Sequence, residues 1–171
     1  FQMVGEDIVI GDEFGPYVIV ANRATGIVSE FHETFVDDTL IKSPDHYTLR
    51  LPNPDAKATG ANARRSRGYE GFAMSVDGSV LYPLLEGPLW DAEAGAYETV
   101  ADGRTALRLL EMDAETRAWT GRSWMYPVED AGNAIGDFNM IDETRGLVIE
   151  RDWGQGDAEF ACAEGQTDTC F

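Results

Sequence analysis

Short apolar segments separated by compact turns dominate this sequence, and they limit the class of fold that it can form. Residues 69–75 and 80–85 are two such segments, and the dipeptide Asp77-Gly78 lies in the turn between them. An Asp-Gly pair between apolar strands is a strong short-range signal of a β-hairpin, since both residues accept the positive φ angles of a tight turn. Helical periodicity of 3.6 residues is hard to find elsewhere in the chain. The pattern therefore predicts an all-β domain.

The same succession of strand, polar turn and strand recurs along the chain. Three predicted strands with short turns follow one another near the start, and two further pairs lie in the second half. The predicted strands are residues 7–12, 17–21, 27–31, 69–75, 80–85, 106–113, 119–128, 138–141 and 147–151. Strands joined by such turns pair in the antiparallel direction. We therefore expect the first three to form an antiparallel meander.

Repeated strand pairs without helices between them are typical of a sandwich, a barrel or a β-propeller. Polar turns of similar composition favour the propeller, and they lie at residues 22–26, 113–117 and 142–146. A four-stranded propeller blade takes about 40–45 residues, so a chain of 171 residues holds about four blades. Closed propellers contain about four to eight blades. The chain therefore forms either the smallest propeller or part of a larger one.

We expect a single domain over residues 1–171, with two segments that interrupt its strand pattern. Residues 36–67 and 89–104 are rich in Asp, Pro, Ala and Gly and show no periodicity. Such segments are typical of long loops at the rim of a scaffold, where binding residues often lie.

The first of these loops carries the only basic cluster of the sequence, formed by Arg64, Arg65 and Arg67. One interpretation is a solvated or internally salt-bridged loop. The other is a binding site for phosphate or carboxylate, because each guanidinium presents a planar fork of hydrogen-bond donors.

The overall charge limits the partners of the protein. Asp and Glu number 31 and Lys and Arg number 13, which gives a formal charge of −18. Surfaces that bind nucleic acid or anionic membranes need clustered Lys and Arg, so no nucleic-acid partner is expected. No run approaches the ~20 apolar residues of a membrane-spanning helix, and we expect no membrane insertion. Cations, neutral molecules and metal-neutralised anions remain as partners.

Acidic residues are concentrated at the predicted strand ends and loop mouths. They are Asp12, Glu13, Glu70, Glu86, Asp137 and Glu150. Calcium takes several oxygen ligands from carboxylates, carbonyls and water, and the strand ends of successive propeller blades converge near the central channel. Two interpretations follow: a calcium site, or ordinary surface acids in a chain that is acidic throughout.

Other catalytic motifs are missing from the sequence. It contains no Gly-x-Ser-x-Gly elbow, no phosphate-binding P-loop and no His-Glu-x-x-His pair. His32 and His46 are the only imidazoles, and we expect both to be exposed residues of loops or strand edges. An enzyme built from this sequence would therefore depend on carboxylates, arginines and a metal.

The two cysteines, Cys162 and Cys170, lie eight positions apart in a polar segment. This spacing suits a loop closed by a disulfide better than a metal site, and the alternative is a pair of free thiols. A disulfide would indicate a periplasmic or extracellular location.

Four motifs together resemble a known family. They are GDEFGPY at residues 11–17, GYEGFAMSVDGSVLY at 68–82, LEGPL at 85–89, and IGD at 135–137 with LVIERD at 147–152. In this order they are similar to the domain family called esterase-like activity of phytase. The resemblance implies a β-propeller of antiparallel four-stranded blades, similar to calcium-dependent phytases and found largely in secreted or periplasmic bacterial proteins.

A domain of that family is roughly twice as long as this chain, consistent with about six blades. The resemblance therefore implies that the chain covers about half to two-thirds of a propeller and is incomplete at both ends. Unpaired sheet edges are avoided in natural proteins. We accordingly expect further propeller polypeptide, or another subunit, as a partner.

The resemblance also implies a function and a set of residues. The function is a secreted, calcium-assisted hydrolase of phosphate or carboxylic esters that acts on a small-molecule ester. The alternative is a non-catalytic extracellular propeller for binding or assembly, stabilised by calcium, and a propeller lactonase is a third possibility. The predicted catalytic residues are Glu70, Asp137 and Glu150, the predicted substrate-binding residues are Arg64, Arg65 and Arg67, and the predicted calcium ligands are Asp12, Glu13, Glu70, Glu86, Asp137 and Glu150.

Overall fold

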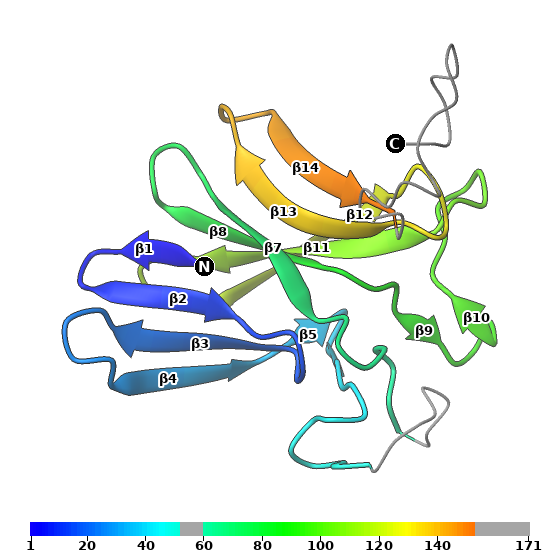
Figure 1. Cartoon of the computed structure of the whole chain (residues 1–171), viewed down its shortest axis with the longest axis horizontal. Coiled ribbons are helices and arrows are strands. Elements are labelled where there is room, and N and C mark those ends of the chain that lie inside the picture. Colours follow the sequence, from blue (N-terminus) through cyan, green and yellow to red (C-terminus); the bar gives the residue numbers. More distant parts are fainter. Residues whose placement is uncertain (52–59, 153–171) are drawn as a thin grey trace, which may run out of the picture.

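A computed structural model of the chain describes residues 1–51 and 60–152 (Figure 1). All regular secondary structure in these two ranges is β-structure, and every strand pair is antiparallel. Within the same ranges there is no helix long and apolar enough to cross a membrane. The predicted all-β class is therefore confirmed.

The first sheet is a four-stranded meander in the order β1-β2-β3-β4. Its strands are β1 (Gln2–Val4), β2 (Asp7–Gly11), β3 (Tyr17–Asn22) and β4 (Val28–Glu33). The meander predicted from the sequence is confirmed, and β1 extends it by one strand. Sequence patterning missed β1 because three residues are too few to show alternation.

The second sheet is also a four-stranded meander, with the order β7-β8-β11-β12. Its strands are β7 (Tyr69–Met74), β8 (Val80–Leu85), β11 (Ala106–Asp113) and β12 (Trp119–Pro127). The turn between β7 and β8 contains Asp77 and Gly78, as predicted, and Gly78 has a φ of 76°. Chain segments far apart in sequence thus pair where β8 meets β11.

A third sheet pairs β13 (Ala134–Met140) with β14 (Gly146–Arg151). Strand β13 begins four residues earlier than the predicted strand of residues 138–141. Gly136 and Asp137 interrupt the apolar pattern, and the pairing with β14 shifts register at Gly136 but continues on both sides of it. Antiparallel sheets of two to four strands are consistent with part of a β-propeller. The described strands do not form a closed ring of blades.

The two segments expected as rim loops contain short strands. Strand β6 (Thr39–Leu40) pairs with β5 (Phe35–Val36), and β9 (Trp90–Asp91) pairs with β10 (Ala96–Tyr97). Each of these four strands has two residues, which is too short for a periodic signal.

The second sheet lies in the middle of the molecule (Figure 1) and contributes to a hydrophobic core on each of its faces. Phe72 and Leu81 pack with Val9 and Val18 of the first sheet, whereas the opposite face packs against β13 and β14. The residues of this second core are Ala73, Leu84, Leu107, Val128, Ile135 and Phe138. Adjacent residues of β7 therefore contribute to two different cores, as the alternation of a strand requires.

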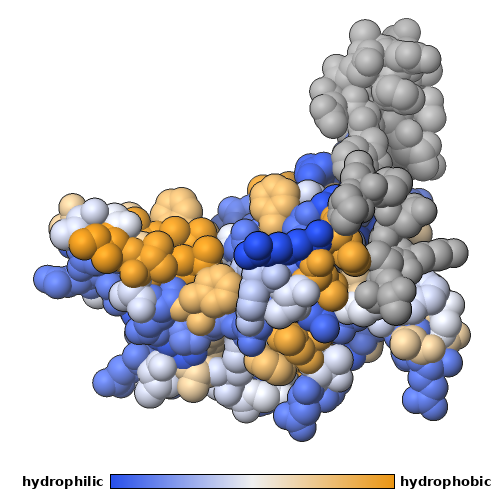
Figure 2. All heavy atoms as spheres, turned by 90° about the horizontal axis from the view of Figure 1, so that it is seen from below, coloured by the Kyte–Doolittle hydropathy of each residue, from blue (hydrophilic) through white to orange (hydrophobic). Residues whose placement is uncertain are grey.

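Apolar side chains also occur on the outside. The strand β4 is the lowest strand of the first sheet in Figure 1, and Val28 and Phe31 in it are exposed. The same side of the molecule, seen from below, shows apolar patches separated by hydrophilic surface (Figure 2).

Two predictions about individual residues have different outcomes. The expectation that His46 is exposed is wrong, because its side chain is fully buried between Tyr17 and Tyr47. The predicted disulfide between Cys162 and Cys170 lies outside the described residues and stays a prediction.

Candidate functional site

Three of the six predicted calcium ligands lie together. Glu13, Glu70 and Glu86 each offer a carboxylate oxygen, and these atoms lie within 4.8 Å of one another. We call this group the carboxylate cluster. Its members differ in burial: Glu86 is buried, Glu13 is half-buried and Glu70 is exposed.

The backbone at the ends of three strands assembles the cluster. Glu13 follows β2, Glu70 is the second residue of β7, and Glu86 follows β8. The Gly68 amide donates to the carbonyl of Glu13 over 2.9 Å, and the Glu86 amide donates to the carbonyl of Gly68 over 2.7 Å. Backbone hydrogen bonds therefore fix the positions from which the three side chains extend.

Gly68 is needed for this close approach of the chain segments. A Cβ atom at this position would lie 2.6 Å from the carbonyl oxygens of both Asp12 and Glu13. Backbone atoms cannot move away as a flexible side chain can, so a larger residue would separate β7 from the end of β2. The glycine before Tyr69 and Glu70 thus has a physical role in forming the site.

The buried carboxylate of Glu86 is neutralised by two arginines. Arg67 donates to its Oε1 over 2.6 Å, and Arg151 donates to the same oxygen over 2.9 Å. Burial raises the pKa of Glu86, the Arg67 charge lowers it, and the neighbouring Glu70 raises it again, with an upward net shift. A buried carboxylate needs such partners because the charge is poorly solvated.

Like charges also act on the exposed member of the cluster. Burial of its carboxylate raises the pKa of Glu70, and the charges of Glu13 and Asp137 raise it further. A cation placed among these carboxylates would relieve the repulsion. Carboxylate oxygens are the ligands that calcium prefers, so the donor chemistry of the cluster fits a hard divalent cation.

Asp12 and Asp137 lie close to the cluster, but their carboxylates have other partners. Asp12 Oδ2 accepts hydrogen bonds from the backbone amides of Phe14 and Gly15, over 3.1 and 2.5 Å. Asp137 accepts one from the amide of Phe138 and one from the side chain of Asn139, both over 2.8 Å. Both residues thus stabilise local backbone in this structure.

Glu150 occupies a different environment from the cluster. Its carboxylate accepts hydrogen bonds from the Tyr126 hydroxyl over 2.6 Å, from the Asn133 side chain over 2.9 Å and from the Glu129 amide over 3.0 Å. These bonds lower the pKa of Glu150 against the opposing effect of burial. The residue joins β14 to the segment between β12 and β13, and the structure does not bring it among the three clustered glutamates.

The predicted arginines divide between two environments. Arg64 and Arg67 line a cavity of about 480 Å³, together with Glu86, Tyr97 and Asn133. The Arg64 guanidinium lies 5.3 Å from the centroid of the Tyr97 ring, a distance at which a cation and a ring attract each other. We call this space the arginine cavity.

Arg65 is not among the residues that line that cavity. It forms an ion pair with Asp45 and donates to the carbonyl oxygen of Leu51 over 2.7 Å. The internally salt-bridged interpretation therefore describes Arg65 and, through its pair with Glu86, also Arg67, although Arg64 and Arg67 both line the cavity in which a ligand would bind.

Sequence reasoning missed three residues of this region, namely Arg151, Tyr97 and Asn133. Arg151 is part of the LVIERD motif, so its position next to Glu150 was a usable signal. Tyr97 and Asn133 lie in segments without a motif. They reach the arginine cavity through the short β10 strand and the loop before β13, which only the fold brings together.

Comparison with known proteins gives one match. A family model described as Phytase-like, esterase-like activity of phytase, matches residues 1–165 of the chain. No curated protein and no solved structure matches it.

Proposed function

The chain belongs to the Phytase-like family, esterase-like activity of phytase, and from this membership and the geometry of the site we propose that it is a calcium-assisted hydrolase of phosphate or carboxylic esters. The family points to hydrolysis in general. Calcium, the ester class and secretion are the further parts of the proposal.

The observation that carries the proposal is the position of Glu86. It belongs to the carboxylate cluster, and it also lines the arginine cavity beside Arg67. A cation held by the cluster and an anion held by the arginines would therefore be neighbours. An acidic protein repels an anionic substrate unless a cation offsets its charge, and this arrangement provides for both.

Each residue of the site has a separate role in the proposed reaction. Glu13, Glu70 and Glu86 would hold calcium, which when bound polarises an ester oxygen and lowers the pKa of a coordinated water. Arg64 and Arg67 bind and orient the anionic group of the ester. Glu70 is the exposed member of the cluster, so it accepts the proton of the attacking water and returns it to the leaving group. Asp137 acts beside it through its charge, and Glu150 keeps Asn133 in position.

The test is hydrolysis of p-nitrophenyl phosphate and p-nitrophenyl acetate by protein treated with EDTA, before and after calcium is added back. We expect turnover that needs calcium. In Glu70→Gln the turnover should fall by a factor of about 100 or more. Arg64→Gln should raise KM for the phosphate ester more than for the acetate. Glu93→Gln, which alters an exposed carboxylate of the β9–β10 turn, is the matched control. Equal rates with and without calcium would refute the proposal.

A non-catalytic propeller stabilised by calcium is the second candidate. It is favoured by the ion pairs of Glu86, which link the segment before β7, the end of β8 and the end of β14. Such a network stabilises the fold whether or not an ester binds. A calcium-dependent rise in melting temperature without any metal-dependent turnover would support this candidate.

We also propose that further polypeptide or another subunit extends the sheets. The sheet of β13 and β14 has two strands, whereas the sheet against which it packs has four. On β14, the apolar side chains of Leu147 and Ile149 are exposed, which suits a strand that pairs with a neighbour. A periplasmic or extracellular location remains part of the proposal, and it would be supported by a disulfide between Cys162 and Cys170.

A further inference from the structure

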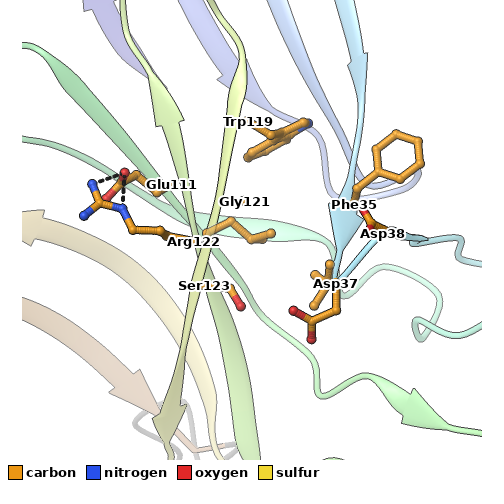
Figure 3. A pocket seen from close by; sticks show the side chains of 10 residues that line it. Phe35, Asp37, Asp38, Glu111, Trp119, Gly121, Arg122 and Ser123 are labelled. Atoms are coloured by element: carbon orange, nitrogen blue, oxygen red, sulfur yellow. Dashed lines mark hydrogen bonds and ion pairs between the residues drawn. The ribbon is translucent and has the colours of Figure 1, made fainter.

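A second cavity lies between the β11–β12 ribbon and the β5–β6 hairpin (Figure 3). Its volume is about 550 Å³. The residues that define it are Phe35, Asp37, Asp38, Glu111, Trp119 and Ser123. We call it the aromatic-acidic pocket. It shares no lining residue with the arginine cavity.

An irregularity of the β11–β12 pairing shapes the floor of this pocket. Leu110 pairs with Ser123 and Met112 pairs with Trp119, so residues 120–122 lie opposite the single residue Glu111. Such a bulge redirects side chains and bends a strand. Gly121 has a φ of 81°, and a Cβ atom there would meet nothing within 4 Å. The floor is therefore open at its centre.

The β5–β6 hairpin places two carboxylates at the mouth of the pocket. Val36 pairs with Thr39, so Asp37 and Asp38 form the two-residue turn, with φ angles of 47° and 62°. Turns of this kind usually contain Asn-Gly or Asp-Gly. In Figure 3 the Asp37 carboxylate points from the hairpin toward β12.

One aromatic residue lines the pocket on each side. Trp119 is half-buried, and its indole nitrogen donates to the carbonyl of Glu33 over 2.8 Å, which fixes the orientation of the ring. Phe35 is 41% exposed on the hairpin opposite. The faces of aromatic rings attract cations, and Trp does so most strongly.

The charges around the pocket leave it negative. Arg122 donates to Glu111 over 2.8 Å, and Arg108 donates twice to Glu98, over 2.8 and 2.7 Å. Each arginine thus has one carboxylate as its main partner. Asp37, which lies 3.7 Å from Arg108, and Asp38 add two further negative charges. Four carboxylates against two guanidinium groups give a local charge of −2.

These carboxylates are too widely spaced to form a metal site. Within residues 1–51 and 60–152, the carboxylate cluster is the group whose ligand atoms come close enough to share an ion. A larger cation, whose charge is spread over alkyl groups, can meet separated carboxylates and aromatic rings at once.

We propose that the aromatic-acidic pocket binds a small organic ammonium ion, with the alkylated nitrogen against Trp119 and Phe35 and its charge facing Asp37 and Asp38. The pocket volume accommodates such a ligand. This binding needs no calcium and no residue of the proposed hydrolytic site, so each proposal can fail without the other.

The test compares choline with its uncharged isostere 3,3-dimethyl-1-butanol, using calcium-free protein at constant ionic strength. The readout is the indole N–H signal of Trp119 in a nitrogen-15 correlation spectrum, assigned by its loss in Trp119→Phe. We expect saturable shifts with choline, and at least fivefold weaker ones with the alcohol.

Asp37→Asn and Asp38→Asn should each weaken choline binding about fivefold. Asn accepts a positive φ at least as well as Asp, so the turn persists in both variants. Glu93→Gln, a charge change on the β9–β10 turn, should leave the affinity unchanged. Equal shifts with choline and the alcohol, or no saturable shift with either, would overturn the proposal. The proposal would also be overturned if Glu93→Gln weakened choline binding as much as Asp37→Asn does.

Discussion

Arg67 and Glu86 meet across the start of β7 and the end of β8, with the guanidinium of Arg67 2.6 Å from Glu86 Oε1. The Glu86 residue is 4% exposed, so its charge depends on protein partners instead of water. Gly87 follows Glu86, and its amide donates to the carbonyl of Arg67 over 3.2 Å. Side-chain and backbone contacts thus hold the same two segments together, and they place Glu86 between the carboxylate cluster and the arginine cavity.

Arg67→Met should destabilise the protein by about 1–3 kcal/mol, because it leaves a buried carboxylate with only part of its hydrogen bonding. Urea unfolding monitored by tryptophan fluorescence measures the effect. Arg145→Met is the matched control, since Arg145 is exposed and pairs with the half-buried Asp142, and it should change stability by less than about 1 kcal/mol. Equal losses in the two variants would contradict the role assigned to the Arg67–Glu86 pair.

The carboxylate cluster should make stability depend on pH. The pKa values of Glu70 and Glu86 are raised above their ordinary value of 4.5, so the folded protein retains protons that the unfolded chain has lost. By linkage, the contribution of these groups to stability falls as pH rises from about 4.5 through the raised values.

Glu70→Gln removes one of the repelling charges. We expect it to raise the melting temperature at pH 8 without calcium and to reduce the rise that calcium causes. Calorimetry at pH 5 and pH 8, with calcium and with EDTA, measures both effects. Glu93→Gln should show neither. A lower melting temperature of calcium-free Glu70→Gln at pH 8 would show that repulsion within the cluster is not significant.

Asp77 should contribute to stability in the opposite pH direction. Its carboxylate accepts hydrogen bonds from the Ser79 amide and from the hydroxyls of Ser75 and Ser79, and these bonds lower the pKa of Asp77 to about 2. The stabilisation is present above the ordinary value of 3.8 and is lost as pH falls toward 2.

Asp77→Ala is therefore expected to have a lower melting temperature than the parent at pH 7. The difference should shrink as the pH approaches 2, and melting curves across this range measure it. Asp77→Asn keeps an acceptor oxygen for the turn, so its melting temperature at pH 7 should lie between those of the parent and Asp77→Ala. A difference that is constant from pH 7 to pH 2 would exclude the carboxylate as its cause.

Gly71→Ala tests the packing of β7 against β13. A Cβ atom at Gly71 would lie 2.8 Å from the Cβ of Phe138, so one of the strands must shift, and we expect a loss of about 1–3 kcal/mol. Gly136→Ala is the control on β13, because its nearest contact would be an ordinary 3.8 Å. Denaturant unfolding distinguishes the two variants. A smaller loss for Gly71→Ala than for Gly136→Ala would mean that these strands are not closely packed.

Much of the fold could be predicted from the sequence, because strand patterning and turn chemistry are local. The β7–β8 hairpin follows from apolar alternation around Asp77 and Gly78, and the first meander follows from similar signals. Two-residue strands such as β5 and β10 carry no such signal, although both supply residues that line cavities. The burial of His46 cannot be predicted from the sequence for a related reason: the contact with Tyr17, which lies 29 residues earlier, depends on the fold.

At the site, sequence patterns indicate which residue types can act, namely carboxylates at strand ends and a group of arginines. Which of these side chains meet depends on the packing of the sheets. Glu13, Glu70 and Glu86 come together because hydrogen bonds at Gly68 join the ends of three strands, whereas Glu150 is held by Tyr126 and Asn133. The physical reason is that a strand end fixes where a side chain begins, while its partners depend on how sheets far apart in sequence pack.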